Sequence, residues 1–68
     1  MRYTDDQLTE AKRQIDSTLH KLRETVKTLE GKEHPSRYKS QITLARRRME
    51  AFGIAVDLIE KELDSKAE

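Results

Sequence analysis

The sequence predicts an all-α protein, an antiparallel two-helix hairpin, because each half of the chain carries a matching apolar ladder and one break separates the two. Most neighbouring members of a ladder are three or four residues apart. This spacing places them on one face of an α-helix, whereas a β-strand needs a period of two. The first ladder comprises Leu8, Ile15, Leu19, Leu22, Val26 and Leu29, and the second comprises Tyr38, Ile42, Ala45, Met49, Phe52, Val56, Ile59 and Leu63.

The first helix is expected over residues 5–30. Thr4 and Gln7 fit a capping box, in which the threonine hydroxyl accepts from the Gln7 backbone N–H and the glutamine side chain accepts from the Thr4 backbone N–H. We expect the helix to stop at Gly31, the residue type best suited to a left-handed position after a helix end.

A short polar loop over residues 31–36 is expected to join the helices, which is a usual length for antiparallel neighbours. Pro35 disfavours helix at the residue before it and leaves Ser36 as the N-cap of the second helix. That helix is expected over residues 37–64, with residues 65–68 frayed.

Composition limits the class of function more than it names one. The chain has 14 Lys+Arg against 13 Asp+Glu, a net charge of +1 that is too small to indicate nucleic acid or acidic lipid by itself. The absence of cysteine excludes disulfides and thiolate metal sites. No apolar run approaches the roughly 18 residues of a membrane span, and the polar N-terminus lacks the apolar core of a signal peptide. We expect one soluble, cytoplasmic domain over residues 1–68, with no membrane partner.

The second helix carries more apolar surface than the first helix can cover. A second stripe lies about 100° around the helix from the ladder, given 3.6 residues per turn. It comprises Leu44, Ala51, Ala55 and Leu58, with Ile54 further round its edge. A helix that is apolar on two sides is usually buried on two sides. We therefore expect a homodimer that forms a four-helix, coiled-coil-like bundle. The alternative is ordinary surface scatter of apolar residues.

Charge placement on the second helix suggests an orientation for that dimer. Residues 32–48 hold six basic residues and one acid, whereas residues 50–68 hold six acids and two lysines. This order opposes the helix dipole, which favours acids at the N-terminus. Antiparallel pairing of two copies, crossing near Ala51, would place each basic half against the partner's acidic half. The alternative is that both halves are simply solvated. The predicted interface comprises Arg37, Leu44, Arg48, Ala51, Ile54, Ala55, Leu58 and Glu62.

Nothing in the sequence resembles an active site, so we expect a non-enzymatic protein without cofactor or metal. The chain has no cysteine nucleophile and is too small for a sizeable pocket. Asp16, His20 and Glu24 have a spacing that can hold a cation. Acidic residues beside a histidine are, however, common on solvent-exposed helices, and we interpret this trio in that way.

One cluster of basic residues supports a different function. Arg37, Lys39, Arg46, Arg47 and Arg48 could contact phosphates, which requires charge more than exact geometry. The three successive arginines spread over about 200° of the helix, so they do not form one compact group. The near-neutral total charge and the lack of an exposed aromatic residue for base stacking also argue against this reading.

The favoured function is therefore a protein-interaction and oligomerisation module that acts on a second copy of itself, or on a helical segment of another protein. The alternative is a small nucleic-acid-binding regulator that uses the basic N-terminal half of the second helix. A short hairpin that dimerises is similar in plan to the small plasmid-encoded RNA-binding regulators built as four-helix bundles. No motif accompanies that similarity, so it is an analogy of architecture alone.

Overall fold

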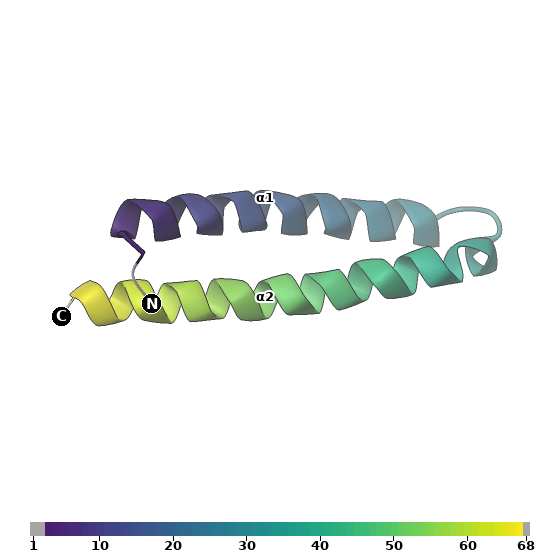
Figure 1. Ribbon diagram of the computed structural model, residues 1–68. Helices are drawn as coiled ribbons and strands as arrows, with labels where there is room; N and C mark the ends of the chain where they lie inside the picture. Colours follow the sequence, from purple (N-terminus) through teal and green to yellow (C-terminus); the bar gives the residue numbers. More distant parts are fainter. Residues whose placement is uncertain (1–2, 68) are drawn as a thin grey trace.

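The computed structural model describes the backbone of residues 3–67 and the side chains of residues 3–65. Two long helices, α1 (Asp5–Glu30) and α2 (Lys39–Ala67), lie side by side, and the short 3₁₀ helix η1 (Pro35–Tyr38) precedes α2 (Figure 1). The start of α1 and the end of α2 lie at the same end of the molecule, as an antiparallel hairpin requires. The hairpin is a rod with extents of 51 × 16 × 15 Å.

The start of α1 is the predicted capping box. The Gln7 backbone N–H donates to Thr4 Oγ1 at 3.1 Å, and the Thr4 backbone N–H donates to Gln7 Oε1 at 2.9 Å. Two backbone donors that the helix leaves unpaired at its first turn therefore find acceptors. Asp5 and Asp6 occupy the first turn, where the helix dipole favours negative charge.

The end of α1 falls at the predicted residue, but by a different geometry. Gly31 has φ −84° and ψ −2°, which is right-handed, so the predicted left-handed conformation is wrong. The Gly31 N–H donates to the Lys27 carbonyl at 3.0 Å and the Lys32 N–H to the Leu29 carbonyl at 3.3 Å. The chain thus leaves the helix through a tightened right-handed turn, whose backbone angles do not require glycine.

The connection also corrects the predicted start of the second helix. Ser36 lies inside η1 and does not cap α2; His34 precedes η1, and its side chain makes no capping hydrogen bond. Pro35 accounts for this, because its fixed φ suits the first position of a helical turn and it has no N–H to satisfy. Helical backbone therefore begins at Pro35, and α-helix proper begins at Lys39 instead of residue 37.

The far end of α2 is longer than predicted. The helix continues to Ala67, so the expected fraying of residues 65–67 is wrong, and residue 68 lies outside the described part. The sequence after Asp64 has no glycine or proline, the two residue types that most strongly disfavour helix.

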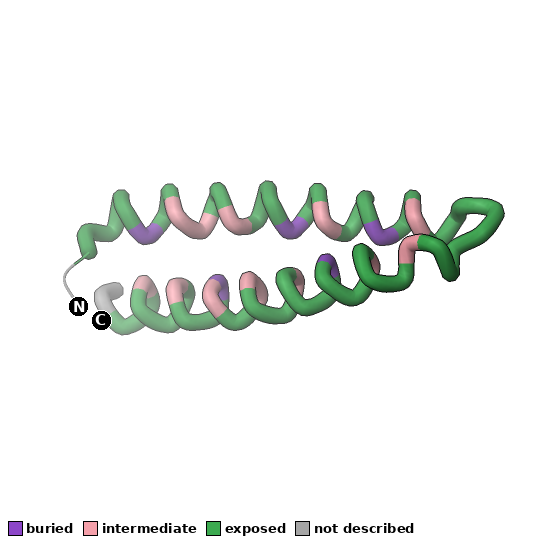
Figure 2. The backbone as a smooth tube through the Cα atoms, turned by 45° about the vertical axis from the view of Figure 1, so that its right-hand side comes forward, coloured by how far each residue is buried: buried purple, intermediate pink, exposed green. Residues whose placement is uncertain are grey.

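The core is the seam between the two ladders. Leu8, Leu19 and Val26 from α1 and Ala45 and Val56 from α2 are buried, and every other ladder residue is half-buried. Figure 2 shows these residues on the sides of α1 and α2 that face each other. Within the described residues, no side chain is completely enclosed. Two helices alone therefore make a thin core, as expected for a chain of this size.

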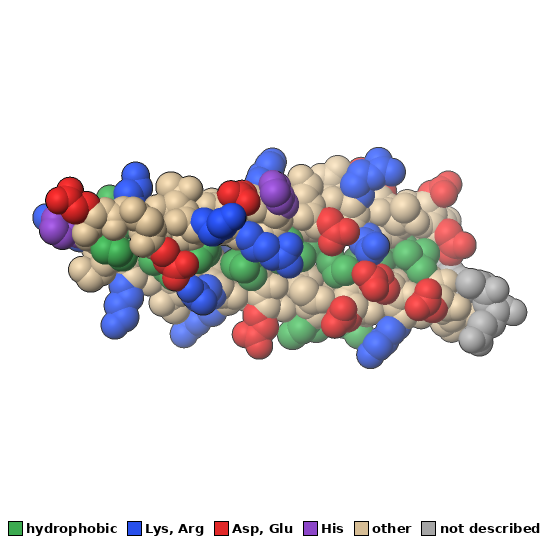
Figure 3. All heavy atoms as spheres, turned by 180° about the vertical axis from the view of Figure 1, so that it is seen from behind, with side chains coloured by type: hydrophobic (Ala, Val, Ile, Leu, Met, Phe, Trp, Pro, Cys, Tyr) green, Lys and Arg blue, Asp and Glu red, His purple; other side chains and the backbone are tan. Residues whose placement is uncertain are grey.

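Two ion pairs join the helices at their edge. Lys12 Nζ lies 3.6 Å from Glu60 Oε1 in the half of the hairpin near its open end, where α1 begins and α2 ends. Arg46 pairs with Glu30 near the connection. At about 100° per residue, all four side chains lie on the same side of the seam. We call this side of the hairpin the charged face. In Figure 3, which views one long side of the molecule, side chains of both signs stand over both helices.

Candidate functional site

The apolar stripe predicted on α2 is exposed in the hairpin. The exposed fractions are 48% for Leu44, 55% for Ile54 and 61% for Leu58. Ala51 is also exposed, and Ala55 is half-buried. Complete burial of a leucine or isoleucine side chain stabilises a protein by about 1.5–3 kcal/mol relative to exposure. A side chain that stays in water does not contribute this stabilisation. Among the side chains that the structure describes, the exposed large apolar ones are Tyr3, Leu44, Ile54 and Leu58.

The charged residues of the predicted interface continue the same stripe. Arg37, Arg48 and Glu62 are exposed. Arg37 belongs to η1, and the other two belong to α2. Alternating steps of three and four residues connect seven of the eight predicted positions with Gln41, which is also exposed. Ile54 is the exception, because it lies further around the helix, almost opposite the core. The structure thus gathers seven of the predicted residues on one side.

An uncharged flank of α1 borders this stripe. It comprises Gln7, Ala11, Gln14, Thr18 and Thr25, again at steps of three, four or seven residues. The Thr18 hydroxyl donates to the Gln14 carbonyl at 3.0 Å, and the Thr25 hydroxyl donates to the Lys21 carbonyl at 2.9 Å. Both hydroxyls are therefore satisfied within α1, and covering them would leave no donor unpaired.

A groove at the open end shows that the α1 flank and the α2 stripe share one side. It has a volume of about 530 Å³, so the expectation that the chain is too small for a sizeable pocket is wrong. It is lined by Tyr3, Gln7, Leu8 and Ala11 from the N-terminal part and by Leu58, Ile59 and Glu62 from α2. We call it the terminal groove. Helical geometry places this side opposite the Lys12–Glu60 and Arg46–Glu30 pairs. We call it the stripe face.

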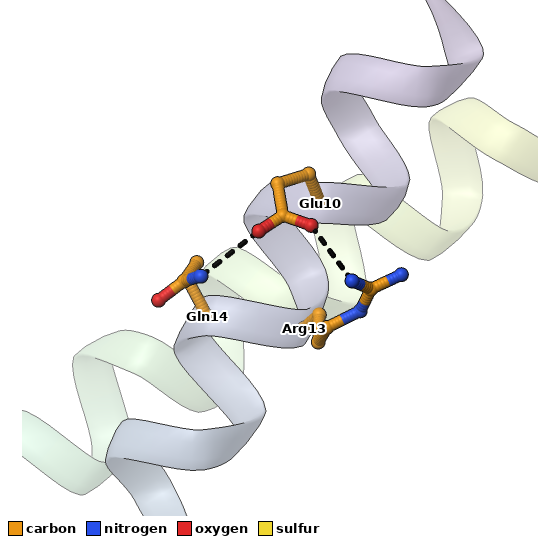
Figure 4. A network of polar contacts seen from close by, with 3 residues as sticks. All are labelled: Glu10, Arg13 and Gln14. Carbon is orange, nitrogen blue, oxygen red and sulfur yellow. Dashed lines mark hydrogen bonds and ion pairs between the residues drawn. The ribbon is translucent and has the colours of Figure 1, made fainter.

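The outer edge of α1 is held by local contacts. Glu10 accepts from the Gln14 amide at 2.9 Å and lies 3.1 Å from the Arg13 guanidinium (Figure 4). Contacts of this kind one turn apart stabilise a helix by a few tenths of a kcal/mol each. They stabilise α1 and give the Gln14 amide, which lies beside the stripe face, an acceptor within the helix.

The structure does not gather the basic cluster into one surface. Arg46 forms an ion pair with Glu30 across the seam. Arg47 and Arg48 are exposed and project away from the seam in different directions. Arg37 and Lys39 are exposed on different sides near the start of α2. These residues offer separate cations instead of one phosphate-binding face.

The metal candidate stays on the solvent side of α1. Asp16, His20 and Glu24 are all exposed. Among the residues that the structure describes, no three or more His, Cys, Asp or Glu side chains are grouped so as to hold a metal ion. Within the same range, neither helix combines the length and the apolar character needed to cross a membrane.

Sequence reasoning found only part of the α1 side of the site, a flank of Ala11, Thr18 and Thr25 that is small enough to lie against a neighbouring helix and that supports a bundle only weakly. Tyr3, Gln7 and Ala11 line the terminal groove but were not among the predicted interface residues. A signal was present, because small or uncharged residues recur along α1 from Thr4 to Thr25 at helical spacing. Only the observed pairing of the helices shows that this flank and the α2 stripe lie on the same face.

Comparison with known proteins gives no relative: no protein-family model, no curated protein and no solved structure matches the chain.

Proposed function

We propose that the chain is a non-enzymatic protein-interaction module that acts through homodimerisation, with the stripe face as its interface. The observation that carries the proposal is the exposure of Leu44 and Leu58 on the stripe of a helix whose other side already forms the core. A helix that is apolar on two sides is usually buried on two sides. A second copy offers an identical stripe and would complete a four-helix, coiled-coil-like bundle.

The orientation follows from charge. The basic segment 32–48, which runs from the connection into α2, and the acidic segment 50–68 attract each other when two copies run antiparallel. A crossing near Ala51 places Leu44 beside Leu58 of the second copy. It also brings Arg37 close to the end of the second copy's acidic segment. Exposed ion pairs of this kind are worth about 0.2–1 kcal/mol each, so they select the orientation more than they add affinity. Parallel pairing would place like charges together.

The function is tested by a charge placed in the stripe. Leu58→Glu should lower the dimer association constant about a hundredfold or more, because each copy would bury an unpaired carboxylate. Leu58 is 61% exposed in the hairpin, so the fold of one copy should survive. The matched control is Thr9→Glu, which adds the same charge at an exposed position on the charged face of α1. Sedimentation and helical circular dichroism should be measured on both variants.

The expected result is a helical monomer for Leu58→Glu and a dimer for Thr9→Glu. Equal association of the two variants would place the interface elsewhere. A functional role in binding nucleic acid would instead appear as a complex with generic RNA or DNA that weakens steeply between low and physiological salt. Under our proposal, no such complex forms.

A further inference from the structure

The terminal groove has the form of a socket on α2. Ala55, Leu58, Ile59 and Glu62 stand at positions i, i+3, i+4 and i+7 of the helix. Four residues with this spacing form the diamond-shaped hole that receives one side chain from a neighbouring helix. Three of the four line the groove, and Ala11 of α1 closes its inner side with a small side chain. The groove is therefore apolar at its base, with the Glu62 carboxylate at one rim.

The two-fold arrangement of the proposed dimer fixes what lies above this socket. Leu44 precedes Ala51 by seven residues, and Leu58 follows it by seven. At 1.5 Å per residue, each leucine is about 10 Å from a crossing at Ala51. Leu44 of an antiparallel second copy therefore lies level with Leu58. Because a two-fold interface repeats every contact, each copy would offer one leucine and one socket.

Charge matches the same occupant. The stripe around Leu44 is basic, with Arg37 and Arg48 exposed, and the rim of the groove is acidic at Glu62. Leu44 itself is 48% exposed, so it is available to enter a socket. An apolar side chain flanked by cations fits this groove better than an acidic segment does.

We propose that the terminal groove is the socket for Leu44 of a second copy, with Arg37 of that copy facing Glu62 at the rim. This proposal rests on the proposed function and makes it specific. It assigns α1 a part in the interface through Ala11, and it assigns the two copies two identical knob-and-socket contacts near the ends of the bundle.

The test uses the absence of cysteine from the chain. Leu44→Cys and Ala11→Cys are prepared separately, mixed, allowed to exchange, and treated with a short bis-maleimide that bridges nearby thiols. The matched control mixes Leu44→Cys with Thr9→Cys, whose position is near Ala11 in sequence but on the charged face of α1. Ser40→Cys, one turn before Leu44 on the same side, repeats the test with the leucine intact.

We expect cross-linked heterodimers with Ala11→Cys and few with Thr9→Cys, for both the Leu44→Cys and the Ser40→Cys partners. Equal yields at the two positions, or preferential linkage of Leu44→Cys to itself, would overturn the socket. Sedimentation of the same variants distinguishes a failure of the socket from a failure of the proposed homodimerisation. A dimer with the wrong cross-links contradicts the socket alone, whereas a monomer contradicts the proposed function as well.

Discussion

The two long faces of the hairpin, the charged face and the stripe face, differ in how far contacts within one chain satisfy their side chains. On the charged face, Lys12 pairs with Glu60 and Arg46 with Glu30, so side chains of one helix reach those of the other. On the stripe face, Leu44 is 48% exposed and Leu58, which lines an open groove, is 61% exposed. The side chains of the charged face therefore form ion pairs within one chain and are well solvated by water. The stripe face leaves apolar surface that a further helix would cover, and the comparison therefore identifies the side on which function should be sought.

The largest expected effect compares one leucine in the core with one on the stripe face. Leu19 is 5% exposed and Leu58 is 61% exposed. Leu19→Ala should lower the free energy of unfolding by about 3 kcal/mol, because it leaves a cavity between the helices. Leu58→Ala should change the stability of the single hairpin by less than about 0.5 kcal/mol. Urea unfolding at low protein concentration measures both.

The same leucine pair sharpens the comparison when the protein concentration rises. The loss of stability caused by Leu58→Ala should grow with concentration, because the intact protein gains stability from association and the variant gains less. The loss caused by Leu19→Ala should be large at every concentration. If Leu58→Ala is without effect even in concentrated solution, the stripe face has no partner copy.

A substitution at Gly53 tests whether the charged face is free of a neighbouring helix. Gly53 lies in the middle of α2, on the side away from the stripe, and a Cβ built there meets no atom within 4 Å. Gly53→Ala should raise the free energy of unfolding by about 1 kcal/mol, since alanine is the better helix former. Thermal unfolding followed by circular dichroism measures the gain. A loss of stability would mean that a neighbour approaches this side closely, which would reverse the roles of the two faces.

The smallest effect concerns the ion pairs themselves. Arg46→Gln removes the contact with Glu30 and should cost no more than about 1 kcal/mol, because both side chains are about half exposed. The cost should shrink as salt is added, since exposed charges are screened. Unfolding in low and high salt checks this, and Arg47→Gln is the control because Arg47 does not reach Glu30. A larger cost that ignores salt would show that the charged face is also covered.

The sequence was sufficient to predict the helical ladders and the start of α1. Every ladder residue is buried or half-buried, because helical spacing alone decides which residues share a face. The capping box was equally local, since Thr4 and Gln7 need only each other. The connection was predicted less well, because Pro35 can either end a loop or begin a helical turn, and the docking of the two helices decides between them.

The candidate site divides in the same way. The stripe on α2 could be predicted, because Leu44, Ala51 and Leu58 lie on one helix and follow one period. The terminal groove could not, because Tyr3 and Ala11 meet Leu58 only once the hairpin has closed. Which flank of α1 borders the stripe depends on how two helices pair, and this information is absent from either helix alone.

The most direct test of the central claim is the mass of the unmodified chain in solution as a function of concentration. Sedimentation equilibrium should be recorded from low to high micromolar protein at physiological salt. The claim that the stripe face pairs with itself predicts that the 8.0 kDa chain approaches twice that mass as concentration rises. A mass that stays at 8.0 kDa up to high micromolar concentration would contradict it.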